Sequence, residues 1–174
     1  TLLSVTGANS YDSSLTSDID LNNILLVNPT SANKPLVFSA LSYYGGGISD
    51  TYTLDTNIDI RNTTITGEFG TDSSIVIQQQ LDPEHTTSVN ISDSIVEGPI
   101  PFSTVPASTA DLGATISMQH SMTTVPVEGI GNQIGQAIFT QGPLGDFYLA
   151  QIPAGNLQTS PGVDAGDPDS SSPF

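Results

Sequence analysis

The chain has 174 residues, 36% of them hydrophobic, and carries 2 basic side chains against 18 acidic ones, a formal net charge of −16. This balance excludes nucleic acid and anionic membrane surfaces as partners, because both bind clustered Lys and Arg. Cys is absent and no run of 18 apolar residues exists, which excludes disulfides, thiolate metal sites and insertion of a membrane-spanning helix.

The composition favours short strands and turns over helices. The chain has 16 Gly and 12 Pro, residues that mark turns, and no long window keeps a helical period. Two apolar runs, residues 36–38 and 74–77, are candidate buried strands. We therefore expect one all-β domain that spans residues 1–174 and has a thin core of short elements.

An apolar–polar–apolar triplet recurs along the chain. Its copies begin at residues 19, 58, 89 and 116, at intervals of 39, 31 and 27 residues. Repeats of about 20–50 residues are typical of solenoids. We predict one strand–bend–strand unit per copy, with the uneven intervals absorbed by loops. An antiparallel sandwich with coincidental spacing is the alternative.

Each triplet is followed by a small polar residue that is expected to bend the chain. The bend residues are Asn23, Asn62, Asp93 and His120, and apolar sequence resumes at Leu25, Ile65, Ile95 and Met122. The outer residues of the triplets should point inward and stack in consecutive repeats. The predicted core comprises Ile58, Ile60, Val89, Ile91, Ile116 and Met118.

The chain closes with two phrases that carry a family resemblance. Residues 145–149 read GDFYL, a short aromatic strand, and residues 160–166 read SPGVDAG; upstream, residues 94–98 read SIVEG. These phrases resemble the C-terminal part of secreted right-handed parallel β-helix proteins, the group that includes choice-of-anchor Q proteins and the polymorphic outer-membrane repeats. The resemblance covers residues 88–168 and departs from the family pattern before Phe139, where an Asp-Pro pair is missing.

The resemblance implies a right-handed parallel β-helix, or β-solenoid, of about four to five rungs. Residues 1–125 would form the rungs, and residues 126–174 would form a C-terminal closing segment. It also implies an extracellular or cell-surface location and a structural turn role for Asp164. It implies no reaction.

Asp20 and Asp59 occupy the same position in consecutive triplets, where both side chains should point outward on neighbouring strands. Such strands lie about 4.8 Å apart, and two ionised carboxylates at that distance repel one another or share a cation. Oxygen ligands suit Ca²⁺, so Asp20 and Asp59 are candidate calcium ligands, and calcium is the one cofactor that the sequence suggests. Solvated surface charge is the interpretation that we favour for the pair.

Catalysis is not expected. The two basic residues, Lys34 and Arg61, belong to different repeats, and no nucleophile-elbow spacing accompanies the two histidines. His120 falls on a bend position, which favours a structural role. His85 is expected in an exposed loop, where a His–carboxylate metal site is the alternative.

Two glycosylation sequons are present, at Asn62-Thr63-Thr64 and Asn90-Ile91-Ser92. Asn90 should point outward between two inward apolar residues, which makes it the better acceptor. Asn62 is expected at a bend.

These observations favour an extracellular, non-enzymatic structural or surface module that self-assembles head-to-tail into filaments. A carbohydrate-binding adhesin is the first alternative, with candidate stacking residues Tyr11, Tyr43, Tyr44 and Tyr52. A polysaccharide lyase or hydrolase is the second. The expected partners are another copy of the chain, preceding rungs of a longer chain, or a surface polysaccharide.

The N-terminal segment is the expected assembly edge. Leu2, Leu3 and Val5 enter directly as an apolar strand, with no amphipathic helix before it, whereas the run Pro153–Pro168 is a candidate cover for the opposite end. Unpaired strand edges invite pairing with another chain. Contact between the N-terminal end of one copy and the C-terminal end of the next does not form a closed ring, so it generates a filament.

Overall fold

The computed structural model describes residues 3–8, 15–28, 36–41, 54–70, 73–79, 86–106, 114–143, 145–163 and 166. Within these ranges the secondary structure consists of strands and one short 3₁₀ turn, η1 (Ile152–Ala154). The strands form three sheets, which we name sheets A, B and C, and one hairpin.

Sheet A contains, in spatial order, β1 (Leu3–Ala8), β4 (Leu36–Leu41), β7 (Ser73–Gln79) and β10 (Ile100–Pro106). Sheet B contains β2 (Leu15–Asn22), β5 (Leu54–Arg61), β8 (Thr86–Ser92) and β11 (Ala114–Gln119). Sheet C contains β3 (Leu25–Asn28), β6 (Thr64–Gly67), β9 (Ile95–Val96), β12 (Met122–Thr123) and β13 (Gln133–Ile134). The hairpin pairs β14 (Phe139–Gly142) with β15 (Gly145–Leu149).

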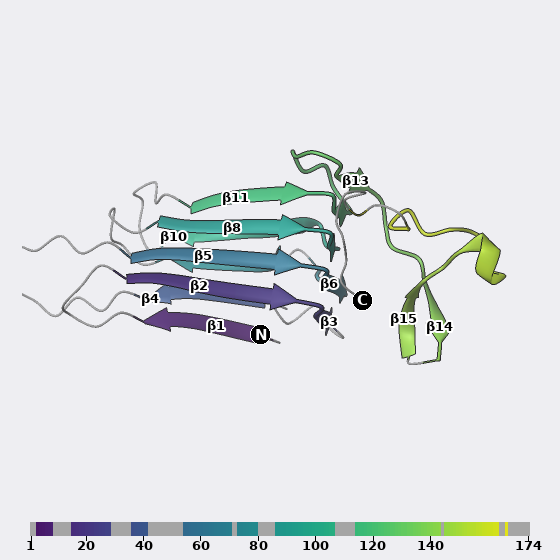
Figure 1. Ribbon diagram of the computed structural model, residues 1–174, viewed down its shortest axis with the longest axis horizontal. Coiled ribbons are helices and arrows are strands. Elements are labelled where there is room, and N and C mark those ends of the chain that lie inside the picture. Colours follow the sequence, from purple (N-terminus) through teal and green to yellow (C-terminus); the bar gives the residue numbers. More distant parts are fainter. Residues whose placement is uncertain are drawn as a thin grey trace, which may run out of the picture.

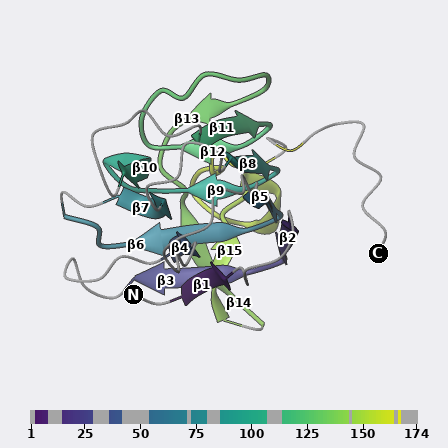
Figure 2. The ribbon, with the colours of Figure 1, turned by 90° about the vertical axis from the view of Figure 1, so that its left-hand side faces the viewer.

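From β1 to β12 the chain visits sheets A, B and C in turn, so each strand after the first circuit lies beside the strand of the previous circuit (Figure 1). The next strand, β13, adds to sheet C directly beside β12. Figure 2 shows sheets A and B nearly end-on, with the strands of sheet C running across. All pairings within the three sheets are parallel. The described part of the chain is therefore all-β with parallel sheets, compatible with a β-solenoid, and the antiparallel sandwich is wrong for it.

The register of sheet B follows the predicted triplets. Ile58 pairs with Ile19 on one side and with Val89 on the other, and Val89 pairs with Ile116. The intervals of 39, 31 and 27 residues therefore separate neighbouring strands, and their differences arise outside the strands. The candidate strands at residues 36–38 and 74–77 lie in β4 and β7 of sheet A.

The inward residues of sheet B form the core. Five of the six predicted core residues are buried, and Ile116 is half-buried and packs against them. Full burial of such a side chain contributes about 1.5–3 kcal/mol. The buried cluster is completed from sheets A and C and the turn between them by Ile65, Phe69, Ile75 and Val96.

The residues at which apolar sequence resumes after the bends do not lie in one column of sheet C. Ile65 pairs with Leu26 and Val96, whereas Leu25 pairs with Thr64. The inward position of β6 is the second residue after the connection from sheet B, and Ile65 is fully buried there. A pattern that looks for the first apolar residue after a bend cannot separate these two neighbouring columns.

The four predicted bend residues connect sheet B to sheet C. Their φ angles lie in the left-handed region: Asn23 57°, Asn62 49°, Asp93 49° and His120 49°. Asn and Asp tolerate this conformation because their short polar side chains bond locally, and His is also enriched there. The bend prediction is confirmed, and His120 has the same backbone role as the other three.

A second, buried column lies beside the bends. Thr63, Ser94 and Ser121 directly follow left-handed residues and are 1%, 3% and 1% exposed. The Thr63 N–H donates to Ser94 Oγ at 3.1 Å, and the Ser94 N–H donates to Ser121 Oγ at 3.1 Å. The Ser121 N–H donates to Asn132 Oδ1 at 3.2 Å. Each buried donor is thus satisfied by the next circuit, as burial requires.

The end of sheet B beyond β11 is partly covered by residues 127–132. The His120 N–H donates to the Ile130 carbonyl at 2.8 Å, and Gly131, with φ of 71°, extends the column of left-handed residues. Asn132 Nδ2 donates to the Met118 carbonyl at 2.9 Å. Val127 packs against the buried cluster.

The structure describes residues 153–163 and 166 of the run Pro153–Pro168, so its role as a cover for this end stays a prediction. The described part includes Gly162, which lies against Leu149 and against Ile95 and Met122 on the outer face of sheet C. The reason is physical: Ile95 and Met122 form an apolar patch on that face, and covering it removes apolar surface from water.

Candidate functional site

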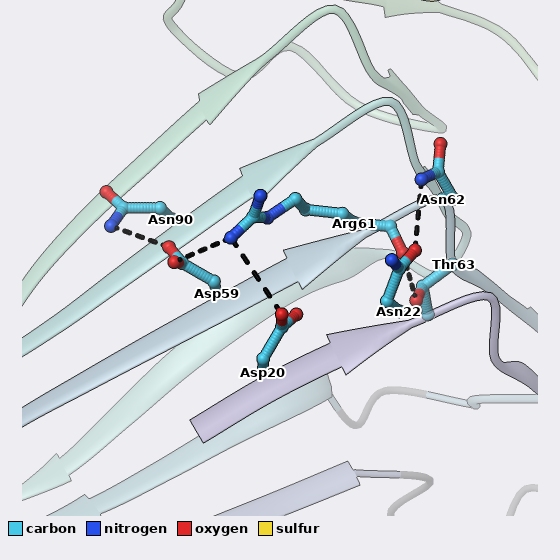
Figure 3. A network of polar contacts seen from close by, with 7 residues as sticks. All are labelled: Asp20, Asn22, Asp59, Arg61, Asn62, Thr63 and Asn90. Atoms are coloured by element: carbon cyan, nitrogen blue, oxygen red, sulfur yellow. Dashed lines mark hydrogen bonds and ion pairs between the residues drawn. The ribbon is translucent and has the colours of Figure 1, made fainter. Parts of the chain in front are cut away.

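The predicted carboxylate pair lies on the outer face of sheet B. Asp20 and Asp59 are directly opposite one another on β2 and β5. Arg61 reaches back between them: its NH2 atom lies 3.1 Å from Asp59 Oδ2 and 3.9 Å from Asp20 Oδ2 (Figure 3). Two carboxylates and a guanidinium therefore form one exposed trio, from residues that sequence analysis had assigned to separate roles.

Arg61 bears directly on the calcium prediction. Two stacked carboxylates require a positive charge between them, and the guanidinium supplies one. Among the described residues, no three His, Cys, Asp or Glu side chains gather closely enough to hold a metal ion. The calcium site at Asp20 and Asp59 stays a prediction, and calcium there would have to compete with Arg61.

Asn90 extends the same column. Its side chain is exposed, and its Nδ2 donates to Asp59 Oδ1 at 3.1 Å while its Oδ1 accepts a bond from Ser117 Oγ at 2.8 Å. The outward orientation agrees with the sequon prediction. A glycan on Asn90 would replace one of the two hydrogens on the nitrogen that donates to Asp59, and it would leave the oxygen that accepts from Ser117 unchanged.

Asn62, the other sequon residue, sits at the end of sheet B. Its Nδ2 donates to Asn22 Oδ1 at 3.0 Å (Figure 3). Its left-handed backbone and exposed side chain place it on the rim of a cleft. Use of either sequon stays a prediction.

The cleft, about 210 Å³ in volume, lies between the bends, sheet C and the closing segment. Three stacked bend residues, Asn62, Asp93 and His120, give it an amide, a carboxylate and an imidazole. Ile95, Met122 and Leu149 give it an apolar wall. Its volume is below the roughly 300–1,000 Å³ of pockets for drug-sized ligands, so it suits a smaller group such as one sugar ring.

Glu97 is a buried polar residue that sequence analysis missed. It is 6% exposed. Its carboxylate accepts bonds from the Thr66 hydroxyl and, at 2.7 Å, from the Ala137 N–H. The side chain therefore ties the segment before β14 to sheet C. The sequence offered one signal, the place of Glu97 in the SIVEG phrase of residues 94–98.

Several predicted site residues lie outside the described residues: Leu2, Tyr11, Lys34, Tyr43, Tyr44, Tyr52, His85 and Asp164. Leu3 and Val5 lie in β1, for which only the backbone is described. Among the described strands, β1 pairs only with β4, so it is an edge strand of sheet A, as the assembly prediction requires.

The described ranges contain no helix with the length and hydropathy that a bilayer crossing demands. Comparisons of the chain with protein-family models, with curated proteins and with solved structures found no match. The resemblance to choice-of-anchor Q proteins and polymorphic outer-membrane repeats therefore stays a prediction.

Proposed function

We propose that the chain is a right-handed parallel β-helix of about four to five rungs that works outside the cell as a non-enzymatic structural or surface module. Further β-strands, from another copy or from other rungs, add at its N-terminal edge. One observation carries this proposal: in sheets A, B and C the strands β1, β2 and β3 each have a neighbour on one side only among the described strands.

An edge of this kind exposes backbone N–H and C=O groups that a further strand can pair. Three edges at one end favour addition of a whole layer. The opposite end is less open, because residues 127–132 bond to the backbone of Met118 and His120 in and beside β11. Head-to-tail assembly would therefore use β10 and the first half of β11.

Sedimentation velocity across a series of NaCl and Ca²⁺ concentrations tests assembly. Self-association should strengthen with salt, because the formal net charge of −16 repels copies at low ionic strength. Deletion of residues 1–5, with circular dichroism to verify folding, should abolish it. A chain that stays monomeric in every condition, with or without the deletion, would refute self-assembly through this edge.

Carbohydrate binding is the second candidate, favoured by the cleft. Asn62, Asp93 and His120 offer groups that bond sugar hydroxyls, and Ile95, Met122 and Leu149 offer an apolar wall for a sugar's C–H face. Titration with mono- and oligosaccharides, followed by amide resonances of Ile95 and Gly162, tests it. Resonances that stay unmoved at millimolar sugar would eliminate the cleft as a sugar site.

A polysaccharide lyase or hydrolase is the third candidate. Its support is the trio of Asp20, Asp59 and Arg61, which combines two carboxylates with a basic group. The trio lies on an exposed sheet face and its charges already pair with one another, so we expect no cleavage in a reducing-end assay with acidic polysaccharides.

A further inference from the structure

Five side-chain hydrogen bonds on the outer face of sheet B run in one direction. In each of these bonds between described side chains of neighbouring strands, the donor belongs to the later strand and the acceptor to the earlier one. The pairs are Asn57 to Asp18 (2.9 Å), Thr86 to Asp55 (2.5 Å), Ser88 to Asn57 (2.7 Å), Asn90 to Asp59 (3.1 Å) and Ser117 to Asn90 (2.8 Å).

The carboxylates set this direction. An ionised carboxylate accepts hydrogen bonds and donates none. Asn57 and Asn90 must therefore turn their NH₂ groups toward Asp18 and Asp59. Their oxygens then face the following strand, where the hydroxyls of Ser88 and Ser117 donate to them.

This series of donors ends at β2, which is the edge strand of sheet B among the strands that the structure describes. Asp18 and Asp20 are both exposed and outward on β2. Neither carboxylate has a proton to donate to a strand on the far side of β2. A strand that pairs there must itself provide donors, or a positive charge, in these two columns.

The next boundary within the sheet shows how the fold meets this requirement. Asp20 and Asp59 stack there, and Arg61 brings its guanidinium to within 3.1 Å of Asp59 and 3.9 Å of Asp20. At this one boundary, where two outward carboxylates are opposite one another, the later strand supplies the basic side chain.

We infer that the free edge of β2 pairs with a parallel strand that carries Lys or Arg in the columns of Asp18 and Asp20. This inference rests on the proposed addition of strands at the N-terminal edge and specifies the partner's chemistry. Arg61 already pairs with Asp59 and Asp20, and Lys34 is the one further basic residue in the chain. A second copy is a poorer partner for this reason.

The Ser117 hydroxyl of β11 does not substitute for a basic residue opposite Asp20. Continuing the internal register would bring Thr115 and Ser117 of a second copy under Asp18 and Asp20. Ser117 already donates its hydroxyl proton to Asn90. The Asp20 carboxylate would then lie opposite a Ser117 Oγ whose proton is already donated to Asn90.

A matched set of eight-residue peptides tests the inference with the intact chain. Each has the sequence of residues 15–22, one unchanged, one with Asp18→Ser and Asp20→Ser, and one with Asp18→Lys and Asp20→Lys. A scrambled version of the lysine peptide controls for attraction to the net negative charge. Binding is measured by fluorescence anisotropy at 50 mM and 500 mM NaCl.

The lysine peptide should bind roughly 2- to 30-fold more tightly than the serine peptide at low salt, because each exposed ion pair is worth about 0.2–1 kcal/mol. High salt should shrink the ratio. Asp20→Asn in the chain should reduce it further, and the matched control Asp55→Asn, one strand away from the edge, should reduce it less. The scrambled peptide should bind more weakly than the lysine peptide.

Equal binding of the lysine and serine peptides would overturn the inference and leave edge addition standing. Equal binding of the lysine peptide and its scrambled version would also overturn it, because the attraction would then lack register. If none of the peptides binds, edge addition itself fails, and the inference fails with it.

Discussion

Truncation of Ile91 to Ala tests the inward register of sheet B. Ile91 is 1% exposed and lies between Ile60 and Met118 in neighbouring strands. The change removes three buried carbon atoms, worth about 2.4 kcal/mol at about 0.8 kcal/mol each. The cavity left behind brings the loss to about 3–5 kcal/mol.

The assay is thermal unfolding followed by circular dichroism. At about 2–4 °C per kcal/mol for a chain of this size, Ile91→Ala should lower the Tm by about 6–20 °C. Ile91→Asp should lower it further, because it buries an unpaired charge.

The matched control is Thr115→Ala, an outward and exposed position on β11. It should change stability by no more than about 0.5 kcal/mol. Equal shifts in Ile91→Ala and Thr115→Ala would refute the assignment of inward and outward faces.

Three further predictions concern the bends and the closing segment. His120→Asn should leave the free energy of urea unfolding unchanged. His120→Val should lower that free energy by about 1–2 kcal/mol, because β-branched residues are disfavoured in the left-handed region. Equal effects of the two substitutions would indicate another role for the imidazole. Gly131→Ala should destabilise the folded chain more than Gly155→Ala. Both glycines have positive φ, but of the two only at Gly131 would the new Cβ meet a neighbour, His120 Nδ1 at 2.5 Å. The opposite order of stabilities would contradict the stacking of Gly131 on His120. Glu97→Ala should lower the free energy of unfolding by about 1–3 kcal/mol and speed hydrogen exchange at the N–H of Ala137, which loses its acceptor. Glu97→Gln should keep most of the protection of that N–H from exchange. Unchanged exchange in Glu97→Ala would show that the hydrogen bond does not hold the segment before β14.

Sheet B was predictable because three independent signals coincide in each circuit. Alternation puts one face inward, a fixed offset separates the triplet from its bend, and the bend conformation selects Asn, Asp or His. Asn62 and Asp93, for example, have the residue type, the offset and the φ of 49° that one bend geometry requires. The interval between successive triplets can vary without changing the register of the strands, because loops tolerate insertions.

The contacts of the closing segment were beyond the reach of local patterns. Glu97 is surrounded by Thr66 and Ala137, which are 31 and 40 residues away in the sequence. Arg61 joins Asp20 only because circuits 39 residues apart lie side by side. Such side-chain contacts depend on how neighbouring circuits pack, and hydrophobic periodicity does not predict them.

Residues separated by one circuit are neighbours in parallel, in-register strands. Because the chain has no Cys, a pair of introduced cysteines reports this directly. Ser88→Cys with Thr115→Cys joins outward positions that are directly opposite on β8 and β11. Ser88→Cys with Ser117→Cys joins diagonal positions, about 7–8 Å apart by sheet geometry and outside disulfide range. On mild oxidation the direct pair should form an intramolecular disulfide in high yield and the diagonal pair should not. Equal yields, or a disulfide in the diagonal pair alone, would contradict the register between β8 and β11.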